Sequence, residues 1–188
     1  MIVDADTTAT AMNDPHLGEV VVSEEAIRKR IAELGKGITA DYQGQRPLLV
    51  GVLKGALIFM SDLIRELDFP LEIDMMAISS YGSSTHTSGV VRILKDLDTD
   101  LTDRHVLVVE DIVDSGLTLS YLRRSLLARN PASLEVCALL VKDGNDGPGN
   151  AIRYTGFHIP PSFVVGYGLD VGERYRNLRQ LYDYRPDA

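Results

Sequence analysis

The sequence His105-Val-Leu-Val-Val-Glu-Asp-Ile-Val-Asp-Ser-Gly-Leu-Thr-Leu119 joins a short apolar run to acidic residues and a turn of small residues. The run at 106–109 is continuously apolar and rich in β-branched residues, which is typical of a central strand buried on both faces of a parallel sheet. Apolar residues recur at helical spacing over 117–128. The stretch therefore predicts a strand, a turn and a helix in that order.

The turn has the features of a phosphate-binding site. In open α/β sheets, ligands bind beyond the carboxyl ends of the strands, and the backbone N–H groups at the start of a helix attract anions. The glycine spacing of a Walker loop or of a dinucleotide-binding loop does not occur here. We expect a phosphate group to be surrounded by Asp114, Ser115, Gly116, Leu117 and Thr118.

Glu110 and Asp111 follow the apolar run directly, at the expected carboxyl edge of the strand. Two adjacent carboxylates would repel a phosphate unless they face hydroxyl groups or a cation. We therefore expect them to face the vicinal hydroxyls of a ribose whose 5′-phosphate lies in the turn. For this pair taken alone, solvated acids in a loop are the alternative interpretation.

The order of these motifs resembles the type I phosphoribosyltransferases and, within that family, the enzymes that act on hypoxanthine and guanine. The resemblance runs from roughly residue 18 to residue 178, and its segments are 52–56, 79–82, 108–118, 140–142 and 163–170. It implies an α/β fold in which helices flank a central, mainly parallel sheet and the terminal segments build a small hood. It also implies transfer of 5-phosphoribosyl from its 1-pyrophosphate to N9 of hypoxanthine or guanine, which gives IMP or GMP and pyrophosphate.

The resemblance assigns the purine end of the site to residues near the carboxyl ends of two strands. Asp114 would be the general base that takes the proton from purine N7, although Asp at this place also suits the N-cap of the following helix. Lys142 would donate to the 6-oxygen, so that adenine leaves a buried ammonium unpaired. Phe163 would stack on the ring, and the backbone of Val164 would contact its edge.

The pyrophosphate end is implied in the same way. Lys54 and Gly55 would bind pyrophosphate, with the Leu53-Lys54 peptide in the cis form, and Arg176 would be the second contact. The negative charge of pyrophosphate calls for Mg²⁺, held largely by substrate oxygens. The residues expected near the cation are Glu110, Asp111 and Asp170, of which Asp170 would also lie near the purine.

A lid that excludes water during the reaction is expected at 80–89, a polar segment that includes Ser80 and Tyr81. Three places depart from the family pattern: the loop at 143–150, Val171 where the family commonly has Tyr, and the tail at 179–188. Their contributions stay open.

Composition sets further limits. The net charge of −8 over 188 residues argues against a nucleic-acid surface. No run of 18 apolar residues and no signal peptide is found, which favours the cytoplasm. Cys137 is expected to be a core residue. We expect a flexible tail at 1–16 and one domain at 17–188.

Further strands are predicted at 48–53, 71–78, 134–141 and 163–165. A helix capped by Ser23 is expected to end at Gly35 and Gly37, and another is expected at 56–67. By resemblance the chain forms a homodimer or homotetramer and binds small-molecule substrates. Two alternatives are a xanthine- or guanine-preferring enzyme and a non-catalytic nucleotide-sensing or RNA-binding regulator.

Overall fold

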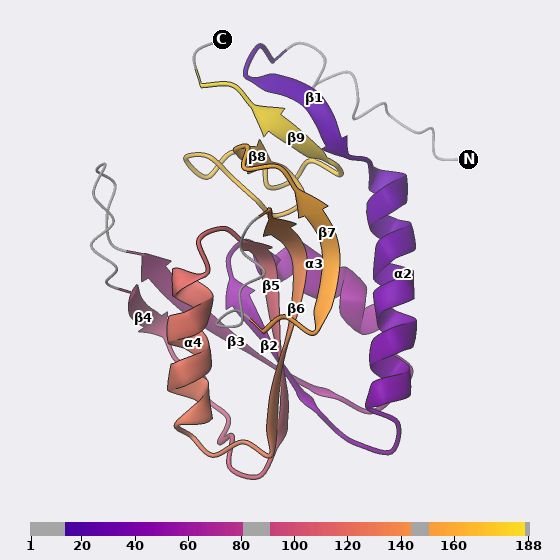
Figure 1. The fold of residues 1–188 in the computed structure, drawn as a ribbon, viewed down its shortest axis with the longest axis vertical. Helices are drawn as coiled ribbons and strands as arrows, with labels where there is room; N and C mark the ends of the chain where they lie inside the picture. The colour runs from indigo at the N-terminus through magenta and orange to yellow at the C-terminus, as the bar shows by residue number, and fades with distance from the viewer. Residues whose placement is uncertain (1–13, 81–90, 144–150, 187–188) are drawn as a thin grey trace.

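The computed structural model describes residues 14–80, 91–143 and 151–186, and Figure 1 shows their arrangement. A six-stranded sheet forms the centre, in the order β4-β3-β2-β5-β6-β7. All neighbouring strands are parallel except β3 and β4. The predicted mainly parallel sheet is confirmed. Its strands are β2 (Leu48–Leu53), β3 (Glu72–Ser80), β4 (Val91–Lys95), β5 (His105–Val113), β6 (Ser133–Lys142) and β7 (Tyr154–Ile159).

Helices cover both faces of this sheet. Helices α2 (Glu24–Asp41) and α3 (Ala56–Leu63) pack on one face, and α4 (Leu117–Leu127) packs on the other. Successive strand side chains point to opposite faces, so along β2 Leu49 joins the cluster with α2 and α3, while Leu48 and Val50 join the cluster with α4. The uninterrupted apolarity of the strands follows from this burial on two sides.

A small antiparallel sheet forms the predicted hood. Its order is β1-β9-β8, with β1 (Leu17–Val22), β9 (Leu181–Tyr184) and β8 (Val164–Val165). It lies beyond the carboxyl ends of β6 and β7, at the top of Figure 1. The tail at 179–188, which had no assignment from the sequence, thus supplies β9, and the strand predicted at 163–165 belongs to the hood instead of the central sheet.

Helix α2 is longer than predicted. Ser23 caps it as expected, because its hydroxyl accepts a hydrogen bond from the N–H of Ala26 at 3.2 Å. The prediction that the helix ends at Gly35 and Gly37 is wrong, since it continues to Asp41. A Cβ at Gly35 would lie 2.6 Å from the Cβ of Glu66, so this glycine lets α2 approach the short 3₁₀ segment at Ile64–Glu66.

Two other boundaries differ from the predictions. Helix α3 ends at Leu63 and passes into the 3₁₀ segment, so the helix expected at 56–67 is shorter. Strand β5 continues to Val113, paired with Val141 of β6. Glu110 and Asp111 therefore lie inside the strand and not after it. Cys137 is fully buried in β6, as expected for a core residue.

Several expectations fall on residues outside those described: the tail at 1–13, Tyr81 and the rest of the lid, and most of the loop at 143–150. At the end of the expected tail, Asp14 accepts a hydrogen bond from Tyr175 Oη at 2.9 Å, and Nδ1 of His16 lies 3.0 Å from the Arg185 carbonyl oxygen. In the part of the chain that is described, no helix is long and apolar enough to span a membrane.

Candidate active site

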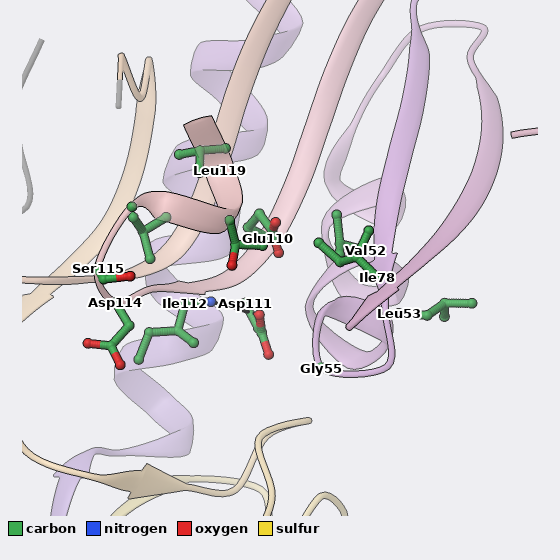
Figure 2. Close-up of a pocket in the computed structure, with 13 residues that line it drawn as sticks. Val52, Leu53, Gly55, Ile78, Glu110, Asp111, Ile112, Asp114, Ser115 and Leu119 are labelled. Carbon is green, nitrogen blue, oxygen red and sulfur yellow. Dashed lines mark hydrogen bonds between the residues drawn. The ribbon is translucent and has the colours of Figure 1, made fainter. Parts of the chain in front are cut away.

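A pocket of about 210 Å³ opens where β2 and β5 end. Figure 2 shows Glu110 and Asp111 between the turn of Asp114 and Ser115 on one side and Gly55 on the other. This is the crevice in which ligands of parallel α/β sheets bind. Of the predicted site residues, the pocket is lined by Gly55, Glu110, Asp111, Asp114, Ser115, Gly116 and Thr118.

The turn before α4 is open to an anion. Gly116 is the N-cap residue and has the left-handed conformation, with φ +71° and ψ −6°. Gly116 makes no side-chain capping hydrogen bond, and Ser115, Gly116 and Thr118 line the pocket. The first N–H groups of a helix have no partner within the helix and carry the positive end of its dipole, so this helix start can attract an anion. The alternative role of Asp114 as the N-cap is wrong, because Gly116 holds that position. Leu117, which begins the helix, is exposed and does not line the pocket.

The carboxyl groups of Glu110 and Asp111 are largely shielded from water. Glu110 is only 6% exposed, and burial, together with the neighbouring Asp111, raises its pKa well above the usual value. Burial raises the pKa of Asp111 to about 6, against hydrogen bonds from the backbone and the nearby charge of Arg176. A ligand that brings hydroxyl donors or a cation would relieve this unfavourable state.

Gly55 is needed for the position of Asp111. A Cβ at Gly55 would collide with the Oδ2 atom of Asp111, so the carboxylate lies directly against the glycine backbone. The preceding Leu53-Lys54 peptide is cis, as predicted. Gly168 packs on the same loop with φ +101°, where a Cβ would collide with the Gly55 carbonyl oxygen. The loop after β2 therefore touches both the β5 carboxylate and the segment before Arg176.

Asp114 and Lys142 form an ion pair, with Lys142 Nζ 3.0 Å from Asp114 Oδ1. The Lys142 side chain is 13% exposed and that of Asp114 is 68% exposed. Lys142 ends β6 and Asp114 follows β5, and the paired positions Val113 and Val141 bring the two strand ends together. Asp114, which the resemblance makes the general base, and Lys142, which it assigns to the purine 6-oxygen, are thus in contact.

A second charged cluster lies at the end of β2. Arg176 Nη2 is 2.7 Å from Asp170 Oδ1, and its Nη1 donates to the Gly168 carbonyl oxygen at 2.7 Å. Lys54 Nζ is 3.0 Å from Glu173 Oε1, and Arg176 Nε is 3.3 Å from Glu173 Oε2. Glu173 was missed by the sequence analysis, although its spacing of three residues from both Asp170 and Arg176 could have indicated it.

Phe163 lies outside the pocket lining and is 52% exposed. Its ring centroid is 5.6 Å from that of Tyr184 on β9, and its carbonyl oxygen accepts from the Tyr184 N–H at 2.7 Å. Val164 follows in β8, paired with Asp183. The C-terminal hood strand therefore holds the predicted stacking residue, a contact that the sequence analysis did not anticipate.

The described residues include no group of three or more His, Cys, Asp or Glu side chains that could hold a metal ion. The negative charge of Asp170 adds to the raised pKa of Asp111, and the charge of Asp111 adds to the raised pKa of Glu110. A hard cation prefers such oxygens. It would fit only if the substrate supplied most of its ligands.

Comparison with known proteins identifies the family of this chain. Residues 20–171 match the phosphoribosyl transferase domain. The chain is 56% identical over 168 residues to the hypoxanthine-guanine phosphoribosyltransferase of Mycobacterium tuberculosis (strain ATCC 25618 / H37Rv), covering 86% of this chain and 83% of that protein. It is 49% identical to the enzyme of the same name from Bacillus subtilis (strain 168), covering 89% and 93%.

A crystal structure of a hypoxanthine phosphoribosyltransferase from Staphylococcus aureus superimposes with a TM-score of 0.86 at 43% identity, covering 93% of this chain and 97% of that one. The hypoxanthine-guanine phosphoribosyltransferase from Bacillus anthracis, crystallised with HEPES in its active site, gives 0.84 at 40%, covering 90% and 99%. The predicted family and fold are confirmed. The chain belongs to the phosphoribosyltransferase family and has the type I fold of its hypoxanthine-guanine members.

Proposed function

We propose that this protein transfers 5-phosphoribosyl from phosphoribosyl pyrophosphate to N9 of hypoxanthine or guanine, in purine salvage. The observation that carries the proposal is the Asp114–Lys142 pair beside the open turn at 115–118. A carboxylate and an ammonium beside a helix start that can attract an anion would suit a purine joined to a sugar phosphate. The relatives named as hypoxanthine-guanine phosphoribosyltransferases support the same activity.

The 5′-phosphate is assigned to the turn. Backbone N–H groups from Ser115 to Thr118 donate to its oxygens, and the dipole of α4 favours its negative charge. Gly116 supports this assignment because its φ of +71° is the left-handed conformation that glycine adopts without steric cost. The phosphate would then anchor the sugar with its anomeric carbon toward the charged groups at the ends of β5 and β6.

The ribose hydroxyls are assigned to Glu110 and Asp111. Both carboxyl groups have raised pKa values in the absence of ligand, so hydrogen bonds from two hydroxyls would favour their ionised forms. A bound Mg²⁺ ion would neutralise pyrophosphate charge and help the leaving group depart. Glu110, Asp111 and Asp170 are the side chains assigned to it, directly or through water.

The purine is assigned to the ends of β6 and β8. The Lys142 ammonium donates to the 6-oxygen, Phe163 stacks on the ring, and the backbone of Val164 contacts its edge near Asp170. Asp114 accepts the N7 proton as N9 attacks C1′. Because Lys142 is only 13% exposed, adenine would leave this ammonium facing an amino group, at a cost that excludes it as a good substrate.

Pyrophosphate is assigned to Lys54 and Gly55 in the loop after β2 and to Arg176, which pairs with the same Glu173 carboxylate as Lys54. The contact of Gly168 with the Gly55 carbonyl oxygen supports this, because it fixes the two segments relative to each other. We further propose a cytoplasmic homodimer or homotetramer, as the family resemblance implies. Light scattering of the purified chain tests the oligomeric state.

The activity is tested by incubating the protein with phosphoribosyl pyrophosphate and Mg²⁺, together with hypoxanthine, guanine, xanthine or adenine, and separating the nucleotides by chromatography. We expect IMP and GMP, and no AMP. A kcat/KM for xanthine above that for hypoxanthine would replace the proposal by the xanthine- and guanine-preferring alternative. Failure to form any nucleotide would overturn it.

A further inference from the structure

We propose that Glu173 is an internal competitor for pyrophosphate, a carboxylate that occupies the place of a phosphate group between Lys54 and Arg176 and lowers the affinity of the site. The inference rests on the proposed function, because it takes Lys54 and Arg176 as the pyrophosphate contacts. It adds a residue that acts against binding.

The first support is the bridging geometry. One carboxylate oxygen of Glu173 lies 3.0 Å from Lys54 Nζ, and the other lies 3.3 Å from Nε and 3.4 Å from Nη2 of Arg176. A carboxylate and a phosphate group offer similar paired oxygen acceptors to these cations. Pyrophosphate cannot take the same hydrogen bonds until Glu173 gives them up.

The second support is that the backbone holds Glu173 in place. Its N–H donates to Asp170 Oδ2 at 2.8 Å. The turn is closed by hydrogen bonds in both directions between Val171 and Arg174. Glu173 itself has φ +65°, a left-handed conformation that is uncommon for a residue with a side chain. The turn therefore presents the carboxylate to the cations at some conformational cost.

The third support is that Glu173 is the carboxylate more easily displaced. Arg176 also pairs with Asp170 at 2.7 Å, and both of these side chains are about one quarter exposed, at 26% and 27%. Glu173 and Lys54 are 63% and 65% exposed. Exposed ion pairs are weak and are screened by salt. Pyrophosphate would therefore replace Glu173 and leave the Asp170–Arg176 pair as the fixed part of the site.

The functional consequence concerns product release. Only ligands that compete with Glu173 are weakened by it, so the effect falls on pyrophosphate and on the pyrophosphate end of the substrate. A nucleoside monophosphate, which leaves Lys54 and Arg176 untouched, is unaffected. Glu173 thus shortens the time for which pyrophosphate stays bound after transfer.

The test compares Glu173→Gln with the wild-type protein by isothermal titration calorimetry with inorganic pyrophosphate in excess Mg²⁺, and separately with GMP. We expect the variant to bind pyrophosphate roughly three- to tenfold more tightly, because two exposed ion pairs are removed. GMP affinity should not change. The gain should shrink as NaCl is raised, since the competing contacts are exposed.

Glu33→Gln is the matched control. Glu33 lies on α2 in an exposed pair with Arg30, so its replacement changes the net charge equally without touching the cluster. An equal gain in both variants would assign the effect to overall charge and overturn the inference. If Glu173→Gln folds poorly, Glu173→Ala takes its place in the same titrations. Thermal unfolding checks that this second variant is folded.

The outcomes separate the inference from the proposed function. Unchanged or weaker pyrophosphate binding by Glu173→Gln, in an enzyme whose wild type forms GMP, would overturn the inference and leave the function standing. A wild-type protein that binds neither GMP nor pyrophosphate would remove the function, and the role of Glu173 with it.

Discussion

The ammonium of Lys142 lies 3.0 Å from the carboxylate of Asp114. The contact follows from strand register, since Val113 and Val141 are partners in β5 and β6 and each charged residue comes next along its chain. Before a purine binds, each group therefore satisfies the other. Under the proposed function, a 6-oxopurine that accepts from Lys142 and donates its N7 proton to Asp114 would replace this pair with two hydrogen bonds.

Asp114→Asn should lower kcat for hypoxanthine by roughly 10²- to 10⁴-fold, the range typical of a lost general base. GMP should still bind within a few-fold of wild type, because the turn at 115–118 keeps its backbone donors. Steady-state kinetics and calorimetry measure the two effects. Asp143→Asn is the control, an exposed acid beside Lys142 that should keep wild-type turnover. Full turnover by Asp114→Asn would move the base to another residue.

Gly55→Ala should lower activity because the new side chain displaces Asp111. The new Cβ would collide with Asp111 Oδ2, so the carboxylate must leave its present position in the pocket. We expect a loss of about 1–3 kcal/mol in the free energy of unfolding and a fall in kcat/KM of at least about tenfold from the misplaced carboxylate. Urea denaturation and initial rates measure these changes.

Gly37→Ala is the matched control for that substitution. Gly37 lies in α2, and a Cβ there would meet no atom within 4 Å. Alanine should therefore stabilise the helix by up to about 1 kcal/mol and leave activity unchanged. If Gly55→Ala behaved like Gly37→Ala, the close approach of Gly55 and Asp111 would have no functional weight.

Local signals explain what the sequence could predict. The strand, turn and helix at 105–128 are visible because apolar run, small turn residues and helical spacing are adjacent in the chain. The hood strand β9 was missed because it is four residues long and pairs with β1 from the opposite end of the sequence. The sequence analysis took Gly35 as the end of helix α2, but this glycine is needed for a tertiary contact with Glu66.

The same limit applies to the candidate site. The pocket residues of 110–118 lie on one continuous segment, so spacing alone indicated them. Glu173 bridges Lys54, which is 119 positions away, and Phe163 rests on Tyr184. Contacts of this kind depend on how the loop after β2 and the hood approach each other. Spacing within a single segment could relate Glu173 to Asp170 and Arg176, but it carries no information about the contact with Lys54 or about that between Phe163 and Tyr184.

Asp111→Asn should make the ligand-free protein more stable at pH 7–8. The folded pKa of Asp111 is raised from 3.8 to about 6, so ionisation between these values favours the unfolded state and destabilises the fold as pH rises. The penalty is complete above pH 6 and absent below about pH 4. We expect a gain on the order of 1–3 kcal/mol at pH 8, measured by urea unfolding in EDTA, with no gain at pH 4. A less stable variant at pH 8 would contradict this.

Asp74→Asn should show the opposite pH dependence. Burial alone would raise the pKa of Asp74, but hydrogen bonds from the N–H groups of Met75, Thr99 and Asp98 lower it overall. A lowered folded pKa contributes stability that is present above pH 3.8 and is lost as pH falls through the folded value.

Asp74→Asn should therefore lower the free energy of unfolding by about 1–3 kcal/mol at pH 7. The NH₂ group of the amide cannot accept hydrogen bonds from the N–H groups of the loop that follows β4. The difference from wild type should shrink toward pH 3. Urea denaturation at several pH values measures it. A pH-independent difference would assign the cost to packing instead of charge.

Tyr42→Phe should stabilise the protein. The side chain is 4% exposed, and its hydroxyl is the buried polar atom that finds no hydrogen-bond partner among the described residues. Burial raises the pKa of this hydroxyl to about 12. Removing a buried hydroxyl that has no partner should add about 1 kcal/mol to the free energy of unfolding, while the ring keeps its contact with Phe69.

Tyr154→Phe provides the matched comparison for Tyr42→Phe. Tyr154 is also buried, but its hydroxyl donates a hydrogen bond to Asp41 Oδ2 at 2.8 Å. The same deletion there should cost about 1–2 kcal/mol, because a hydrogen bond to a charged group is lost. Urea denaturation of both variants should give changes of opposite sign, with kcat unaffected in each. A loss of stability in Tyr42→Phe would mean that its hydroxyl has a partner, such as a buried water, and the comparison would then measure two satisfied tyrosines.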